Sequence, residues 1–213
     1  MTKVRFDIST SLDGFVAGPN PTLKDPLGEG GEQLHEWALE LAAWRAPHGL
    51  EGGETNASSS VLEEALAGAG AHVMGRRMFS GGSGPWEDDP NPDAWWGDEP
   101  PFHAPVFVLT HHARETVRKE GGTSFTFVTD GIASAVEQAR AAAAGKDVAI
   151  AGGADVIQQA LATGLVDEFT LTVAPILLGG GTRLFESVEP TSLELTRVIE
   201  GPRAAHLSYR VVK

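Results

Sequence analysis

Short apolar runs alternate with amphipathic stretches along most of the chain. Residues 4–9 alternate apolar and polar positions, which predicts a first strand. Further short apolar runs predict buried strands at residues 71–74, 106–109, 125–128 and 148–151. Amphipathic stretches predict helices at residues 33–45, 60–70, 130–144 and 156–161. Strands that alternate with helices are typical of an α/β domain with a mostly parallel sheet.

The C-terminal part of the chain departs from this alternation. Val166–Ala174 reads as a longer strand that ends at Pro175. Leu193–Ile199 and Ala205–Val212 read as two closing strands with no helix between them, so we expect them to be antiparallel. The sequence therefore predicts one domain over residues 1–213, in three layers. Its mostly parallel, twisted sheet is flanked by helices and carries antiparallel C-terminal strands.

Turn and cap residues separate these elements. Ser60 and Glu63 form a candidate capping box, and Asp130 is the expected N-cap of the helix that Gly145 ends. Residues 12–21 read as a loop. Residues 80–105 form a much longer segment that is rich in Gly, Pro, Asp and Trp. Loops of this length in a compact domain are usually functional or disordered, and the tryptophans argue against disorder.

Composition narrows the possible functions. The net charge of −13 argues against nucleic acid or an anionic membrane as the main partner. The chain contains no cysteine, which excludes disulfides and thiolate sites. No apolar run reaches the ~18 residues of a membrane helix, and we expect a cytoplasmic protein. His111 and His112 are adjacent and would point to opposite faces of a strand, so we expect no metal site.

Two glycine turns carry the most specific chemical signal. The run that ends at Met74 stops at Gly75, and the run that ends at Ala151 stops at Gly152-Gly153. A strand that turns at glycine directly into a helix directs backbone N–H groups and a positive dipole end at one point, which suits phosphate. The sequence therefore predicts a phosphorylated nucleotide held at two helix ends of one sheet.

Four motifs, in this order, resemble the dihydrofolate reductase-like fold: Ser11-Leu12-Asp13-Gly14, Met74-Gly75-Arg76-Arg77, Gly152-Gly153, and Ala174-Pro175-Ile176-Leu177-Leu178-Gly179-Gly180-Gly181 followed by Phe185. The resemblance is closest to the branch that includes the reductase domain of the riboflavin-biosynthesis deaminase/reductase. It implies an NADPH-dependent oxidoreductase that transfers hydride to a small heterocycle, as a 5-amino-6-(5-phosphoribosylamino)uracil reductase does. It also implies a homodimer, which the apolar C-terminal strands would suit.

The resemblance assigns cofactor contacts along the chain. It implies that Arg76, with Arg77, meets the cofactor phosphates, and that an arginine accepts the 2′-phosphate of NADPH. The residues it implies for the cofactor are Ala17, Gly18, Gly75, Arg76, Arg77, Thr110, His111, Gly152, Gly153, Ala154 and Asp155. A bland alternative for the two arginines is a pair of solvated side chains, although a cation at a helix start is unfavourable without an anion beside it.

The substrate side is less specific. Asp13 is the first candidate for a catalytic polar anchor, although Asp-Gly is also an ordinary turn dipeptide. The candidate substrate contacts are His35, Trp86, Leu178, Gly179 and Gly180. Of the three tryptophans in the long loop, we expect two to be core anchors and Trp86 to face a flat ring. A non-catalytic nucleotide- or flavin-binding module is the main alternative, and a Rossmann dehydrogenase is disfavoured because the first turn lacks G-x-G-x-x-G.

Overall fold

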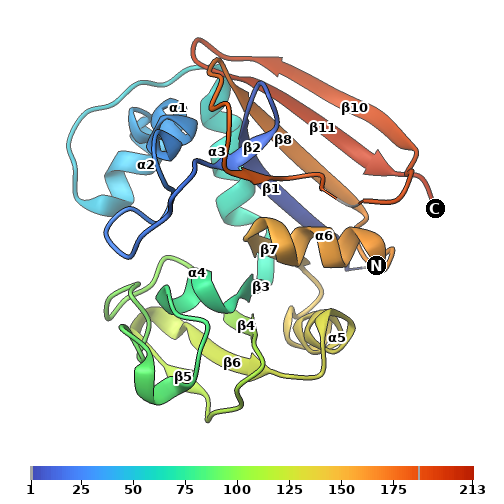
Figure 1. Cartoon of the computed structure of the whole chain (residues 1–213). Helices are drawn as coiled ribbons and strands as arrows, with labels where there is room; N and C mark the ends of the chain where they lie inside the picture. The colour runs from blue at the N-terminus through green and yellow to red at the C-terminus, as the bar shows by residue number, and fades with distance from the viewer. Residues whose placement is uncertain (1, 187) are drawn as a thin grey trace. The chain divides into compact units, whose positions relative to one another are not determined.

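A computed structural model describes residues 2–186 and 188–213, and these residues divide into two compact units (Figure 1). Unit 1 contains the N-terminal residues up to Phe6 and the segment Ala69–Asp167. Unit 2 contains Asp7–Gly68 and Glu168–Lys213. Strand β1 (Val4–Ser11) contributes its first residues to unit 1 and the remainder to unit 2.

Unit 1 contains the predicted parallel sheet, in the order β1–β7–β3–β4–β6–β5. All pairs are parallel except β5 with β6. Its remaining strands are β3 (Ala69–Gly75), β4 (Pro105–Leu109), β5 (Val117–Arg118), β6 (Ser124–Val128) and β7 (Asp147–Gly152). Its helices are α4 (Arg76–Ser80), α5 (Ile132–Ala142) and α6 (Ala154–Ala162), with short 3-10 turns at Trp86–Asp88 and Glu120–Gly122.

Unit 2 contains the antiparallel strands at the C-terminus. Strand β11 (Ala205–Val211) pairs with both β8 (Glu168–Ala174) and β10 (Leu193–Glu200), which confirms the predicted antiparallel arrangement (Figure 1). The predicted loop after β1 contains a short strand, β2 (Phe15–Ala17), which pairs with β9 (Thr182–Arg183). The longest helix of unit 2 among the described residues is α3 (Ala57–Ala67), which packs against β10.

The predicted continuous helix over residues 33–45 is wrong. The chain instead forms a 3-10 turn at Gly31–His35, two one-turn helices at Glu36–Leu39 (α1) and Ala42–Arg45 (α2), and a 3-10 turn at Ala46–His48. Leu41 is extended, with φ −76° and ψ 138°. Around it, the Glu40 carbonyl accepts from the Glu54 amide and the Ala42 amide donates to the Glu54 carbonyl. Backbone pairing with a distant segment therefore replaces helical bonds at this point.

Two predicted caps are also wrong. Helix α3 begins three residues before the Ser60 that was expected to cap it, because Asn56 accepts from the Ser58 amide and Ser59 completes the capping box. Helix α5 has Gly131 as its N-cap rather than Asp130, and no side chain caps it. It ends at Ala142, before the predicted end at residue 144. The helices themselves lie where the amphipathic pattern predicts them.

A buried polar network links α3 to the sheet of unit 2. The His206 side chain is only 1% exposed, and its two ring nitrogens lie 2.9 Å from Thr172 Oγ1 and 2.8 Å from Ser58 Oγ. The Trp37 indole packs edge-on against His206 and donates to Ser9 Oγ. Because one imidazole nitrogen can donate and the other accept, a neutral ring satisfies both hydroxyl partners.

This network predicts a loss of stability in mild acid. Burial lowers the pKa of His206 below its ordinary value of 6.5, and the nearby Arg197 acts in the same direction. As the pH falls, His206 is therefore protonated in the unfolded chain before it is protonated in the folded chain. The contribution of His206 to stability is fully present above pH 6.5 and declines as the pH falls towards the folded-state pKa. Between pH 7.5 and 5.5 we therefore expect the free energy of unfolding, measured by urea unfolding, to fall because the unfolded chain takes up a proton at His206.

The matched variant for this test is His206→Gln. It removes the titrating group, so its free energy of unfolding should depend less on pH than that of the wild type. Other histidines, such as the partly buried His72, whose pKa burial lowers to about 4, retain their share of the dependence in both proteins. Parallel curves for the two proteins over this pH range would contradict the assignment to His206.

Candidate functional site

The two glycine turns lie side by side at one edge of the unit 1 sheet. Strands β3 and β7 are parallel neighbours, and Met74 pairs with Gly152. A Cβ built on Gly75 would lie 3.9 Å from the backbone nitrogen of Gly153. The predicted juxtaposition of these turns is therefore confirmed, and the carboxyl ends of parallel strands are where α/β sheets bind ligands.

The second turn has an open side. Gly152 has φ +135°, a conformation that favours glycine, and the two glycines are joined by a cis peptide bond. A Cβ on Gly153 would meet no atom within 4 Å, and this residue is exposed. Helix α6 begins at the next residue with no side-chain cap. Its first-turn N–H groups have no partner within the helix, so this turn can bind an anion by donating to it.

Arg76 has partners inside its own unit. Its side chain is 6% exposed, forms an ion pair with the buried carboxylate of Asp89 and donates to Ser80 Oγ. Its guanidinium carbon lies 3.5 Å from the centroid of the Trp86 ring. Burial lowers the pKa of Arg76, and Asp89 opposes this shift. The anion expected beside an arginine at a helix start is thus supplied by the Asp89 carboxylate of the same chain.

The other predicted cofactor residues of unit 1 lie around the same sheet edge. Arg77 is exposed, and it follows Arg76 on a helix of only five residues. Thr110 is buried at the end of β4 and accepts from the His112 amide through its hydroxyl, whereas His111 is exposed. The exposed Asp155 carboxylate accepts from the side chain of Gln159 one turn further along α6.

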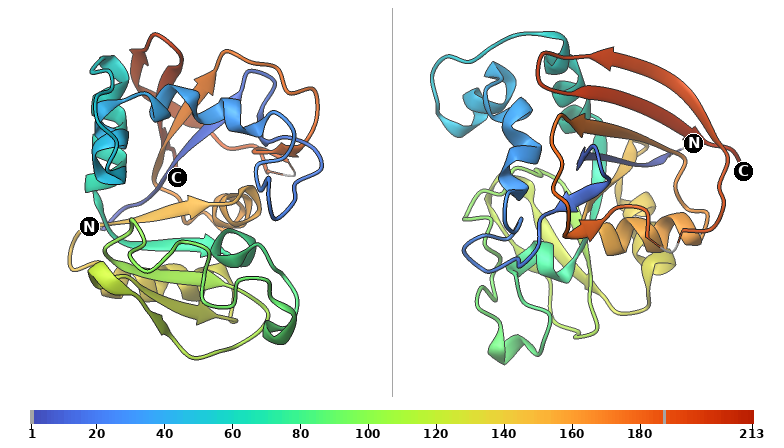
Figure 2. Two further views of the ribbon diagram at one scale, coloured as in Figure 1. Left: turned by 90° about the vertical axis from the view of Figure 1, so that its left-hand side faces the viewer. Right: turned by 45° about the horizontal axis from the view of Figure 1, so that its top comes forward.

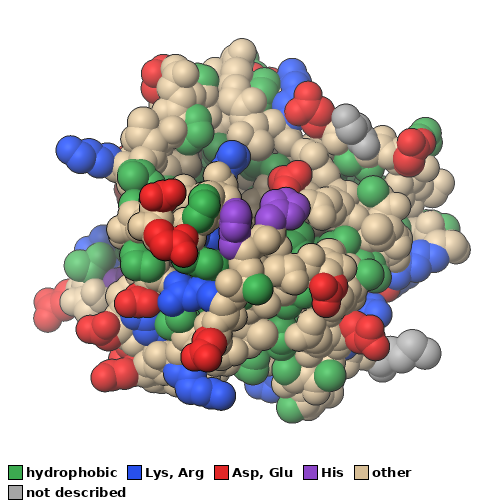
Figure 3. Space-filling view, turned by 60° about the horizontal axis from the view of Figure 1, so that its bottom comes forward, with side chains coloured by type: hydrophobic (Ala, Val, Ile, Leu, Met, Phe, Trp, Pro, Cys, Tyr) green, Lys and Arg blue, Asp and Glu red, His purple; other side chains and the backbone are tan. Residues whose placement is uncertain are grey.

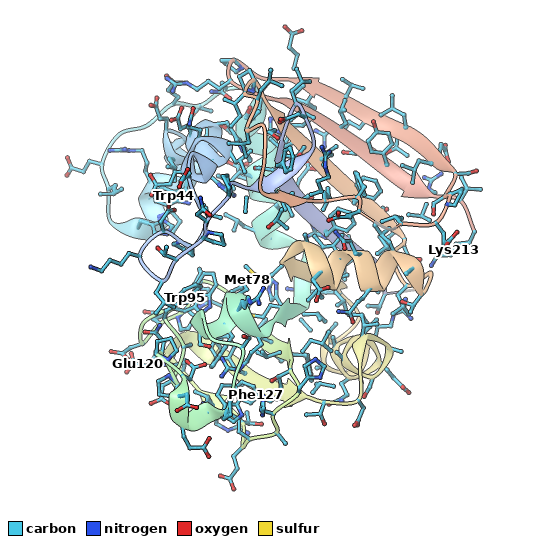
Figure 4. All side chains as sticks on the ribbon, in the orientation of Figure 1. Trp44, Met78, Trp95, Glu120, Phe127 and Lys213 are labelled. Carbon is cyan, nitrogen blue, oxygen red and sulfur yellow. The ribbon has the colours of Figure 1, made fainter. Side chains whose placement is uncertain are left out.

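The tryptophans of the long loop anchor it to α4. The indole N–H groups of Trp95 and Trp96 both donate to the Met78 carbonyl, at 2.8 and 3.1 Å, which confirms that these two are anchors. Trp95 and Met78 are labelled in Figure 4. Trp86 donates to the His112 carbonyl, and its ring contacts the guanidinium groups of Arg76 and Arg114. All the partners of the Trp86 ring described here are therefore internal to unit 1.

Asp13 ties two distant segments of unit 2 together. Its carboxylate accepts from the amides of Leu178 and Gly179, at 3.1 and 2.7 Å. The hydroxyl of Ser11 and these two amides lower the pKa of Asp13 to about 2. Three of the predicted residues of the substrate side are thus brought together. The Asp13 carboxylate is ionised at neutral pH and acts there as a hydrogen-bond acceptor.

Ala17 and Gly18 are enclosed by the backbone of neighbouring turns. A Cβ on Gly18 would lie 2.0 Å from the Glu29 carbonyl oxygen, and one on Gly181 would lie 2.1 Å from the Ala17 carbonyl oxygen. Gly180, by contrast, has open space where a Cβ would be. The glycine run therefore has one close-packed member, Gly181, and two open members, Gly179 and Gly180, a distinction that composition does not reveal.

His35 is partly buried at the end of its 3-10 turn. Its Nδ1 is buried and has no hydrogen-bond partner among the described residues. Burial lowers the pKa of His35, so the ring is neutral at pH 7. A neutral imidazole with an unsatisfied nitrogen retains the capacity to bond a polar ligand.

Two functional features escaped sequence reasoning. The partner of Arg76, Asp89, lies in the long loop, where no periodicity distinguishes it from Asp88 or Asp93. The role of Ser11 as a donor to Asp13 was hidden within the Ser11–Gly14 motif. The sequence offered one signal for the first feature: Arg76 is a cation at a helix start, which is unfavourable without an anion nearby. This signal indicates an anion but does not identify it.

Acidic and basic side chains are scattered over the face drawn in Figure 3 rather than gathered into a patch of one sign. Among residues 2–186 and 188–213, no cluster of three or more His, Asp or Glu side chains could hold a metal ion. Within the same residues, no helix combines the length and the apolar character required to span a membrane.

The chain belongs to the RibD C-terminal domain family, whose family model matches residues 2–207. Its fold is similar to that of a putative riboflavin biosynthesis protein from Shewanella sp. PV-4, with 22% identity, a TM-score of 0.64 and full coverage of both chains. It is also similar to a diaminohydroxyphosphoribosylaminopyrimidine deaminase/5-amino-6-(5-phosphoribosylamino)uracil reductase from Thermotoga maritima. That similarity has 14% identity and a TM-score of 0.56, and it covers 99% of this chain and 57% of that one.

An uncharacterized protein from Bacillus subtilis, YyaP, is 31% identical over 96 residues, which are 43% of this chain and 50% of YyaP. The matched region thus spans about half the length of this relative. These comparisons establish the dihydrofolate reductase-like α/β fold of the chain and its membership of the RibD C-terminal reductase-like domain family.

Proposed function

We propose that the protein is an NADPH-dependent reductase that transfers hydride to a small heterocycle, of the 5-amino-6-(5-phosphoribosylamino)uracil reductase type. The observation that carries this proposal is the pair of adjacent glycine turns, with Gly75 beside Gly153 and an uncapped helix start at α6. Membership of the RibD C-terminal domain family supports it. When bound, the nicotinamide supplies the hydride, and the protein positions the reactants and excludes water.

The open side of Gly153 fits a cofactor pyrophosphate. The amides of Gly153, Ala154 and Asp155 would donate to it, because the first-turn N–H groups of a helix lack internal partners. The Cβ of any other residue at position 153 would project into this open space. The exposed Arg77 would donate to the 2′-phosphate, since Arg76 is already paired with Asp89.

In unit 2, the segment Leu178–Gly180 and the neutral His35 would contact the substrate. Asp13 holds Leu178 and Gly179 through their amides and so has a positioning role. Because the pKa of Asp13 is about 2, this carboxylate does not supply the proton that accompanies the hydride at neutral pH. A water molecule or a substrate group supplies that proton in this proposal.

Gly153→Ala is expected to weaken NADPH binding at least tenfold while leaving the fold intact. The added methyl contacts no protein atom within 4 Å, and φ at this position is an ordinary −82°. Its free energy of unfolding should therefore stay within about 0.5 kcal/mol of the wild type. Binding is measured by titration calorimetry with NADPH and with NADH, and stability by urea unfolding.

The matched control is Gly84→Ala, which also adds a methyl in open space, but in the long loop. It should bind NADPH like the wild type. Arg77→Ala should weaken NADPH more than NADH, because only NADPH carries the 2′-phosphate. Equal NADPH affinity in Gly153→Ala and wild type would refute the cofactor site. Tight NADPH binding with no loss of nicotinamide absorbance, in the presence of ribosylaminouracil substrates, would favour a non-catalytic binding module.

A further inference from the structure

Two segments of unit 2, residues 11–14 and 176–179, are tied together around Asp13. The Leu12 amide donates to the Ile176 carbonyl at 2.9 Å, and the Asp13 carboxylate accepts from the last two amides of the second segment. Figure 2 shows β2 in blue beside β9 in orange, the strands that follow these two segments and pair with each other. We call the two segments together the Asp13 surface.

Both segments of the Asp13 surface present a leucine to solvent. Leu12 is 69% exposed and Leu177 is 72% exposed. Leu178 is partly buried and lies against the turn at Gly30, where an added Cβ would be 3.3 Å from Leu178 Cδ2. Sites for small molecules are lined mostly by apolar side chains, with a few polar groups that fix orientation. The Asp13 surface has this composition.

The backbone donors of this surface are already occupied by an internal anion. Consecutive amides that converge on one point form a nest that suits a phosphate or carboxylate. Here the amides of Leu178 and Gly179 converge on the Asp13 carboxylate, at 3.1 and 2.7 Å, and the pKa of Asp13 is about 2. A substrate phosphate at this point would compete with Asp13 for the same donors and would be repelled by its charge.

The arginines of unit 2 are also engaged. Arg183 of β9 donates to the Asp13 carbonyl at 3.2 Å, and its guanidinium carbon lies 4.4 Å from the centroid of the Phe15 ring. Arginine is the side chain best suited to phosphate, because its forked donors match two phosphate oxygens. Every other arginine of unit 2 has an acceptor within the same unit: Arg197 pairs with Glu64, Arg203 with Glu40 and Arg210 with Glu194, and Arg45 donates to the Glu51 carbonyl.

Carboxylates accompany the turn that carries His35. Glu32 lies on this turn and Glu36 directly after it, and both are exposed. His35 adds no positive charge at pH 7, because burial lowers its pKa. The turn begins after Gly30, which lies next to Leu178, so its carboxylates are close to the Asp13 surface. Exposed charges act over about 8 Å at physiological ionic strength, and here they disfavour an anionic ligand.

We infer that the substrate of this protein is an uncharged heterocycle without a phosphate group, which packs against Leu12 and Leu177. This assignment rests on the proposed reductase function and narrows it, because an aminouracil substrate would enter as the nucleoside rather than as the nucleotide. The two leucines contact the apolar parts of the nucleoside. A phosphate group would instead give up hydration beside carboxylates, which is costly without a cation to pair with it.

NADPH oxidation with 5-amino-6-ribosylaminouracil and with its 5′-phosphate tests the inference. We expect kcat/KM to be roughly tenfold or more higher for the nucleoside than for the phosphate. Leu177→Lys places a cation on the Asp13 surface, so it should raise kcat/KM for the phosphate relative to the nucleoside by roughly tenfold or more. The matched control is Leu66→Lys, which changes a leucine of 57% exposure on α3 and should leave this ratio unchanged.

Lys24 lies in an exposed loop of unit 2, so Lys24→Ala serves as a further check. This variant should also leave the ratio unchanged, and a lower kcat/KM for the phosphate alone would overturn the inference. An unchanged ratio in Leu177→Lys would overturn it as well, provided that urea unfolding shows that the variant is folded.

Calorimetric binding of the two compounds separates this inference from the proposed function. Equal or faster NADPH oxidation with the phosphate would overturn the inference and leave the reductase function standing. If neither compound were oxidising NADPH, the proposed function would fail, and binding alone would decide the substrate class. Tighter binding of the nucleoside would then support the inference. Equal or weaker binding of the nucleoside, or binding of neither compound, would overturn it.

Discussion

Replacing Asp89 with alanine is expected to lower the free energy of unfolding by about 3–5 kcal/mol. The carboxylate is fully buried and pairs with Arg76, which is 6% exposed, so the variant leaves a buried cation without its counter-ion. The carboxylate also accepts from Ser80 Oγ at 2.9 Å and from the Asn91 amide at 2.8 Å. Urea unfolding measures the change, and tryptophan fluorescence follows release of the loop, because Arg76 lies over the Trp86 ring.

The control for this prediction is Asp93→Ala. Asp93 pairs with Arg114 in the same loop, but its side chain is 74% exposed, so its removal should change stability by about 0.5 kcal/mol or less. A double variant, Arg76→Met with Asp89→Leu, should recover most of the loss, because it removes both buried charges together. If Asp89→Ala were no less stable than Asp93→Ala, the ion pair would not organise the loop.

Gly181→Ala is expected to destabilise the protein by about 3 kcal/mol or more. The residue has φ +118°, and an added Cβ would lie 2.1 Å from the carbonyl oxygen of Ala17 and 2.6 Å from the carbonyl carbon of Gly18. Both obstacles are backbone atoms, so one of the two segments must move. Under the proposed function, this movement also displaces Leu178 and Gly179, and activity should fall with stability.

The neighbouring glycine supplies the comparison. A Cβ on Gly180 would meet no atom within 4 Å, so Gly180→Ala should retain wild-type stability within about 0.5 kcal/mol. Urea unfolding of the two variants side by side measures the contrast. Equal stabilities would show that the close contact between residues 17–18 and 181 does not constrain the native state.

The sheet of unit 1 was predictable because each buried parallel strand carries its own apolar signal. The runs at 71–74, 106–109 and 148–151 became β3, β4 and β7 with only small changes at their ends. The meeting of Gly75 and Gly153 was predictable for the same reason, since parallel strands end at a common edge. Local pattern and a general rule of topology were sufficient here.

Interactions between distant segments were not predictable. The apolar spacing of residues 33–45 fits a helix, but pairing with Glu54 breaks it at Leu41. The position of Arg76 at a helix start indicates a neighbouring anion, but a cofactor phosphate and a loop carboxylate neutralise its charge equally well. The hydrogen bonds from Leu178 and Gly179 to Asp13 cross more than 160 positions of sequence. No window of local sequence contains such pairs.

The discontinuous composition of unit 2 has a consequence for protein synthesis. Its first segment ends at Gly68 and its second begins at Glu168, and the His206–Ser58 contact joins residues 148 positions apart. On the ribosome, α3 emerges long before β10 and β11, the two strands with which it makes contact. Unit 1 has all its strands once residue 167 has emerged. The nascent chain should therefore complete unit 1 first and carry unit 2 incomplete until β11 has emerged.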